Sequence, residues 1–201
     1  MLVNTLWRVK PRTLAAMVRV SRALGIALVL LVGQAPLHAQ TTGTAPPLPA
    51  SAKAGMPELK VLGGGLLRVL GFRVYNAYLW TPAGAAFDHS KPHVLDLQYL
   101  RNFSAKKLAE RSIDEMRGQG VGDDAVYVKW LSEMERVFAD VKEGDRLTGV
   151  VTPARTAKFF FNGAYRGEVS DPLFTDAFFG IWLNEKSSQP RMRNQLLGKP
   201  E

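Results

Sequence analysis

The sequence predicts an α+β fold, with one antiparallel sheet and helices gathered over it. Three observations support this prediction. The chain has 201 residues, of which 46% are hydrophobic and 22% are charged, as in an ordinary globular domain. Strand-like and helical segments come in blocks, in the order strands, two helices, strands, two helices. Asn162-Gly163 stands between two apolar segments, which is a strong signal for a tight hairpin.

The expected strands are rich in Val, Leu, Phe, Tyr and Trp. The first is short and ends at the glycine run 63–65, and the second contains Gly71 as a bend or bulge. In the third strand Leu95, Leu97 and Tyr99 share one face, because successive side chains of a strand point to opposite sides. The expected strands cover residues 59–62, 66–80, 94–101, 146–151, 157–161 and 165–169.

Four helices are expected, and polar residues or proline mark where they begin. Ser104 caps the first helix, and Asp123 or Asp124 starts the second. Asp171 opens the third helix, and Pro172 suits its first turn. A short fourth helix lies near the C-terminus. Because apolar side chains recur at helical spacing in the first two helices, both should pack on the sheet.

Residues 1–39 have the pattern of a secretory signal peptide. Residues 1–22 carry five basic side chains and no acidic one, and the small residue Ala39 follows an apolar run at 23–32. This run is about half as long as a membrane-spanning helix. We therefore expect Sec-type export to the periplasm, with cleavage near Ala39 and no stable membrane insertion afterwards. An uncleaved membrane anchor is the alternative.

The net charge shrinks once this N-terminal segment is set aside. Residues 1–39 hold five of the 26 basic residues and none of the 18 acidic ones, so the charge falls from +8 to +3. A domain of this charge without a cluster of Lys and Arg is not expected to bind nucleic acid. The proline-rich stretch at 40–57 indicates a flexible linker, which leaves residues 58–201 as one domain.

Metal and nucleotide sites have little support in the sequence. The chain has no cysteine, which excludes disulfides and thiolate metal sites. His89 and His93 have the spacing of helical metal ligands, but Pro92 between them favours an exposed turn. The glycine run 63–65 lacks the Lys-Ser/Thr ending of a phosphate loop. We therefore expect no metal and no cofactor.

Two arginines, Arg68 and Arg73, interrupt the apolar segment at 66–80. An arginine whose stem lies among apolar side chains either extends its guanidinium into water or pairs with an anion. A nearby tyrosine, Tyr75, Tyr78 or Tyr99, would donate its hydroxyl to the same anion if that were a carboxylate. The residues alone leave both interpretations open.

Several sequence runs, taken in order, resemble the bacterial chalcone isomerase-like family. They cover about residues 58–198 and read GGGLLRVLGFRVYNAYLW, LQYLRNFSAKKLAERSIDEM, KEGDRLTGVV, FFFNGAYRGEV and FFGIWL. The resemblance implies an open-faced β-sandwich, in which helices cover a large antiparallel sheet. Plant chalcone isomerases close a flavanone ring between sheet and helices. Relatives of the same fold bind fatty acids, with an arginine and a tyrosine on the carboxylate.

The resemblance also assigns candidate ligand-binding residues. The arginine that enzyme and fatty-acid binders share falls at Arg68, and the tyrosine of the binders falls at Tyr75, where the enzyme has threonine. Three further enzyme positions, a catalytic tyrosine, a helix asparagine and a second threonine, fall at Ser104, Arg111 and Met192. Four of the five enzyme positions therefore differ. Losing one hydrogen-bond donor of this kind costs an enzyme about a hundredfold in rate.

These assignments imply a binding protein rather than a catalyst. We expect an exported chalcone isomerase-like protein that holds a fatty acid or similar amphipathic carboxylate in a cleft between sheet and helices. Arg68 and Tyr75 would hold the acid group, and apolar side chains would hold the tail. Two alternatives stay open. One is an envelope protein-interaction module without a ligand, whose protein partner is unknown. The other is an enzyme of the chalcone isomerase type, an isomerase or lyase acting on a phenolic or unsaturated small molecule.

Overall fold

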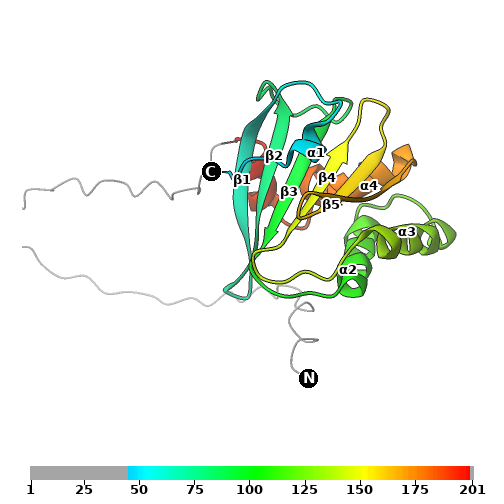
Figure 1. The fold of residues 1–201 in the computed structure, drawn as a ribbon. Helices are drawn as coiled ribbons and strands as arrows, with labels where there is room; N and C mark the ends of the chain where they lie inside the picture. Colours follow the sequence, from blue (N-terminus) through cyan, green and yellow to red (C-terminus); the bar gives the residue numbers. More distant parts are fainter. Residues whose placement is uncertain (1–44, 200–201) are drawn as a thin grey trace, which may run out of the picture. The chain divides into compact units, whose positions relative to one another are not determined.

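The computed structural model describes residues 45–199, which build a six-stranded antiparallel sheet (Figure 1). Each strand pairs with the next one along the chain, so the spatial order follows the sequence order. The strands are β1 (Leu59–Val69), β2 (Phe72–Pro82), β3 (His93–Tyr99), β4 (Arg146–Val151), β5 (Ala157–Phe161) and β6 (Ala164–Val169). The predicted α+β fold is confirmed.

The longer helices begin where the sequence predicts, because side-chain oxygens bond the free N–H groups of the first turns. The hydroxyl of Ser104 accepts from the backbone N–H of Lys107 at 3.3 Å. The carboxylates of Asp123 and Asp171 do the same for the two later helices. The helices are α1 (Ala50–Lys53), α2 (Ala105–Gly118), α3 (Asp124–Val137), α4 (Pro172–Leu183) and α5 (Pro190–Leu196). Within residues 45–199 no helix has both the length and the apolar character needed to cross a bilayer.

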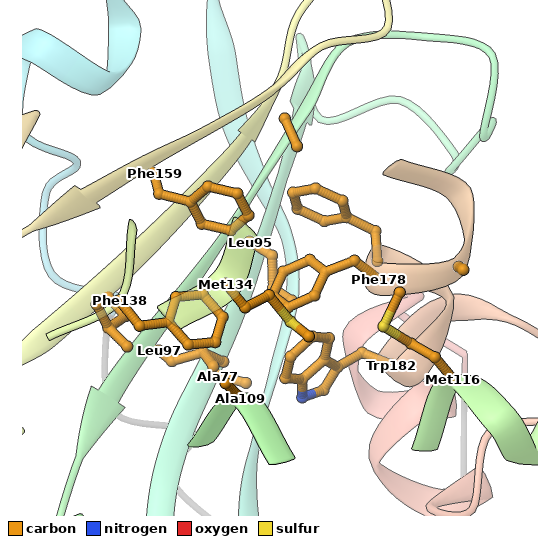
Figure 2. Close-up of a cluster of buried hydrophobic side chains, with 14 of the residues drawn as sticks. Ala77, Leu95, Leu97, Ala109, Met116, Met134, Phe138, Phe159, Phe178 and Trp182 are labelled. Carbon is orange, nitrogen blue, oxygen red and sulfur yellow. The ribbon is translucent and has the colours of Figure 1, made fainter. Parts of the chain in front are cut away.

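The main core lies between the sheet and helices α2 to α5, and we call this side of the sheet the inner face. Figure 2 shows how its side chains meet. The ring centroid of Phe178 lies 5.2 Å from that of Phe159 and 5.6 Å from that of Trp182, with the rings edge to face. Sheet and helices contribute comparably to this cluster, which includes Ala77, Leu95, Leu97, Ala109, Met116, Met134 and Phe138.

The glycine run does not end the first strand, as the sequence suggested, but lies in the middle of β1. Helix α5 packs directly on it. A Cβ atom at Gly63 would lie 2.2 Å from the carbonyl oxygen of Gln195, and one at Gly65 would lie 3.0 Å from Sδ of Met192. Glycine is therefore required here because α5 approaches β1 closely, and not because the strand needs flexibility.

Residues 45–56, predicted to belong to a flexible linker at 40–57, instead pack on the opposite, outer face of the sheet. The carbonyl oxygen of Pro47 accepts a hydrogen bond from Arg146 at 3.1 Å. Figure 1 shows α1 in front of the sheet and α5 behind it. The domain therefore extends at least to residue 45 rather than beginning at 58, because this stretch has apolar side chains to bury. The outer-face cluster contains Leu48, Ala52, Val94, Val150 and Phe160.

The predicted signal peptide at 1–39 lies outside the described residues.

Candidate functional site

Tyr75 lies on the inner face of β2 and contacts α4. The indole Nε1–H of Trp182 donates a hydrogen bond to the phenol oxygen of Tyr75 at 2.9 Å. Trp182 is buried, and a buried indole N–H needs such an acceptor. Among residues 45–199 the hydroxyl of Tyr75 donates to no other group.

A second phenol, that of Tyr99 on β3, stands beside Tyr75 as its cross-strand partner. The two rings meet edge to face, with centroids 5.7 Å apart. No residue between 45 and 199 forms a hydrogen bond with the hydroxyl of Tyr99. Burial raises the pKa of both phenols well above its ordinary value, because a phenolate would lose its hydration. Both hydroxyls keep their protons at neutral pH and are donors.

A charged pair on α2 acts electrostatically on the phenol of Tyr75. Arg111 forms an ion pair with Glu115 one turn later, and the hydroxyl of Ser188 donates to the same carboxylate at 2.9 Å. Burial is the main cause of the raised pKa of Tyr75, the Glu115 carboxylate raises it further, and the Arg111 guanidinium lowers it. The site thus combines two phenol donors with one cation and one anion.

Arg68 does not join this group. It lies exposed near the end of β1, opposite Arg73. A bulge at Val74 lets Tyr75 pair with Leu67. Because side chains alternate along a strand, Tyr75 shares the inner face with Leu67, and Arg68 points to the outer face. The structure does not bring Arg68 and Tyr75 together.

The remaining sequence-predicted residues lie in structural positions. Ser104 caps α2, and Met192 is buried on α5 above Gly65. Of the other predicted residues, Arg111 acts electrostatically on Tyr75 and lowers its pKa. Trp182, which the sequence analysis did not assign to the site, completes it. The sequence could have indicated Trp182, because a tryptophan on a buried helix face needs a hydrogen-bond acceptor for its indole N–H.

His93 lies in a buried strand position, where the sequence favoured an exposed turn. It is 3% exposed and stands between the rings of Phe87 and Phe179. Its Nδ1 lies 2.9 Å from the carbonyl oxygen of Lys91, and its Nε2 has no partner among residues 45–199. Burial lowers the pKa of His93 to about 4, so the ring is neutral at pH 7. No group of three or more potential metal ligands occurs within the described residues.

A groove lies on the outer face of the sheet and has a volume of about 760 Å³. Its lining includes the apolar side chains of Val150 and Phe160. Its two charged residues, Lys158 and Glu168, pair with each other at 3.9 Å. Both charged side chains of the groove therefore have a partner within the chain.

Comparison with known proteins agrees with the fold. The chalcone isomerase-like family matches residues 40–198. An uncharacterized protein of Haemophilus influenzae is 30% identical over 128 residues, which make up 64% of this chain and 62% of that protein. The chain thus spans less than two thirds of the length of this relative.

Among solved structures, a fatty-acid binding protein of Arabidopsis thaliana superposes with a TM-score of 0.56. Its sequence is 14% identical, and the match covers 70% of this chain and 87% of that one. At this identity the likeness shows the fold alone. The family match, by contrast, covers most of the sequence, including every described strand and helix. The chain belongs to the chalcone isomerase-like family.

Proposed function

We propose that the protein binds a fatty acid or a similar amphipathic carboxylate at Tyr75, between the inner face of the sheet and the helices. The observation that carries this proposal is the hydrogen bond from the Trp182 indole to the phenol oxygen of Tyr75. That bond fixes the phenol and leaves its O–H free to donate. A carboxylate is the acceptor that gains most from such a donor, because charge-assisted hydrogen bonds are stronger than neutral ones.

The nearby ion pair supports an acidic ligand. Arg111 forms an ion pair with Glu115, and its positive charge acts on the phenol of Tyr75. The same charge would attract a ligand carboxylate that accepts a hydrogen bond from Tyr75. Since burial keeps the phenol protonated, as its raised pKa indicates, the ligand meets a donor and not a second anion.

The side chains around this position suit an acyl chain. Met192 on α5 and Met116 on α2 are buried in the same core as Trp182. Methionine side chains are unbranched and adapt to irregular apolar ligands. The Arabidopsis protein, which is named for fatty-acid binding, supports the proposal because it has the same fold.

The test compares two tyrosines. Palmitate binding to the wild-type protein and to Tyr75→Phe is measured by isothermal titration and native mass spectrometry. We expect Tyr75→Phe to lower the affinity about tenfold, the effect of removing a hydrogen bond to a charged group. Tyr165→Phe is the matched control, because Tyr165 is 54% exposed on β6. Equal affinities for wild type and Tyr75→Phe would overturn the proposal.

Arg68→Ala tests which cation binds the acid group. With Arg68 on the outer face, this variant should keep the affinity within about twofold, whereas Arg111→Gln should lower it about tenfold. The reverse result would support the clamp of Arg68 and Tyr75 that the sequence predicts. It would mean that the arginine reaches around the edge strand β1 when ligand is present.

We also propose export, on the support of the basic and apolar pattern of residues 1–39. Expression in a bacterium followed by N-terminal sequencing of the periplasmic fraction tests it. A mature chain beginning near Gln40 is expected, and an uncleaved chain in the membrane fraction would contradict it.

A further inference from the structure

The tip of the hairpin between β1 and β2 carries exposed apolar and basic side chains together. We propose that this hairpin tip docks onto the surface of an anionic lipid bilayer. The hairpin tip consists of Arg68, Leu70, Phe72, Arg73 and the neighbouring Arg101. The proposal goes beyond ligand binding at Tyr75 and does not depend on it.

Leu70 is the first indication. It forms the two-residue turn with Gly71, and Val69 pairs with Phe72 across the turn. The φ angles of Leu70 and Gly71 are 49° and 81°, as in a type I′ turn, where Asn, Asp or Gly is favoured. A leucine is strained in this conformation. Leu70 is also 58% exposed, so burial within the chain does not offset the strain.

Phe72 extends the apolar surface next to the turn. It is 47% exposed, and the guanidinium carbon of Arg101 lies 4.8 Å from the centroid of its ring. The arginine covers one side of the ring and presents its charge beside it. Two large apolar side chains thus project at the end of a hairpin and have basic groups around them.

The arginines of the hairpin tip have no carboxylate partner among residues 45–199. Arg68 and Arg73 face each other across the two strands, where like charges repel. None of Arg68, Arg73 and Arg101 forms an ion pair with any residue between 45 and 199. Elsewhere in the fold, Arg117, Arg136, Arg146 and Arg155 each pair with a carboxylate.

An anionic bilayer satisfies both kinds of group at once. Lipid phosphates accept charge-assisted hydrogen bonds from guanidinium groups and would relieve the repulsion between Arg68 and Arg73. Leu70 and Phe72 would enter the boundary between head groups and acyl chains. A purely electrostatic partner such as nucleic acid would leave these two apolar side chains in water.

The experiment uses the protein from Gln40 onward, which removes the apolar run at 23–32 as a competing membrane-binding segment. The described residues 45–199 belong to one compact unit, so we expect this protein to fold without the segment. Vesicles of phosphatidylcholine with about 30% phosphatidylglycerol are compared with pure phosphatidylcholine vesicles by cosedimentation. We expect binding to the anionic vesicles only, and release at about 0.5 M NaCl.

Two variants separate charge from apolar contact. Arg68→Gln with Arg73→Gln should weaken vesicle binding about twentyfold or more, since each basic residue near an anionic surface contributes about fivefold. Leu70→Asn should weaken it about fivefold through lost apolar contact. This variant should keep or raise Tm, because asparagine tolerates the left-handed conformation. Lys53→Gln with Lys91→Gln is the control for charge, and Val128→Ser, at a residue 69% exposed on α3, is the control for apolar exposure.

Equal binding of wild type, both tip variants and both controls would overturn the proposal. Equal binding to neutral and anionic vesicles would overturn it as well. A failure to bind either vesicle, together with crosslinks from position 70 to an envelope protein, would assign the hairpin tip to a protein partner instead.

Discussion

Arginines at the centre of the outer face and at the hairpin tip have opposite surroundings. At the centre, Arg146 donates to the carboxylate of Asp96 at 2.6 Å, and Asp96 is fully buried. Thr148 donates to the second oxygen of the same carboxylate at 2.7 Å. At the hairpin tip, Arg68 and Arg73 face each other in water without a carboxylate.

The difference shows that a buried charge needs a partner of opposite charge within the fold, whereas an exposed charge does not. A buried carboxylate without a cation is very costly, so Asp96 needs Arg146 beside it. Arg146 also donates to the carbonyl oxygen of Pro47, at the start of the stretch that packs on the outer face. Exposed charges have no such requirement, so those of the hairpin tip remain available to an external anion.

The largest expected effect comes from breaking the central pair. Asp96→Ala leaves Arg146 partly buried without its carboxylate and should lower the free energy of unfolding by about 3–5 kcal/mol. Urea denaturation followed by tryptophan fluorescence measures it. Asp114→Ala, at an exposed position on α2, is the control and should change stability by less than about 0.5 kcal/mol. A loss for Asp96→Ala no greater than that of the control would contradict the role given to the pair.

A smaller change in stability should come from His93, which lies on the same strand as Asp96. Its buried ring contacts a backbone carbonyl oxygen instead of a charged partner. Its pKa falls from 6.5 to about 4 on folding, mainly through burial. Below pH 6.5 the unfolded chain therefore binds a proton that the folded chain does not. The free energy of unfolding therefore stays at its full value above pH 6.5. It falls by about 3 kcal/mol in total as the pH drops toward 4. Urea midpoints between pH 7 and pH 4 measure it.

His93→Leu is the matched variant, because it fills a similar volume and cannot be protonated. It should remove most of the fall in stability between pH 6.5 and pH 4. If wild type and variant lose stability equally over that range, other groups cause the pH dependence.

The smallest expected effect belongs to the hairpin tip itself. Arg68→Gln with Arg73→Gln removes a repulsion between opposed like charges and should leave the free energy of unfolding unchanged or raise it by about 0.3 kcal/mol. Urea denaturation at low salt measures the change. A loss above about 1 kcal/mol would mean that these arginines stabilise the fold, and the contrast with Arg146 would then disappear.

Local signals in the sequence predicted most of the secondary structure. Ser104, Asp123 and Asp171 cap helices where expected, because capping involves residues only two or three positions apart. The turn at Asn162 and Gly163 joins β5 and β6 as the dipeptide indicates. Tyr75 was a candidate both from its place beside Arg68 and Arg73 and from the resemblance to a family, whereas Arg111 was a candidate through the resemblance alone.

Two regions could not be predicted because their structure depends on distant residues. The glycine run 63–65 looked like a break, but α5, more than a hundred residues later, packs on it. Residues 45–56 looked like a linker, but their few apolar side chains find Val94 and Val150 on the outer face. In both cases a segment with weak local preference takes the structure that its partner imposes.

By itself, the sequence determined the order of strands and helices, the helix starts and the tight turn at Asn162 and Gly163, since these depend on neighbouring residues. It did not determine the turn at Leu70 and Gly71, because residues 66–80 have the composition of one strand with a bend at Gly71. The tertiary structure alone decided which residues share a site. A regular hairpin closing at Val69 and Phe72 would place Tyr75 opposite Leu66, on the same face as Arg68. The bulge at Val74 shifts the register by one residue and turns Tyr75 to the inner face. That shift brings the phenol of Tyr75 within hydrogen-bond distance of Trp182 on α4, a contact that only the packing of sheet against helix provides.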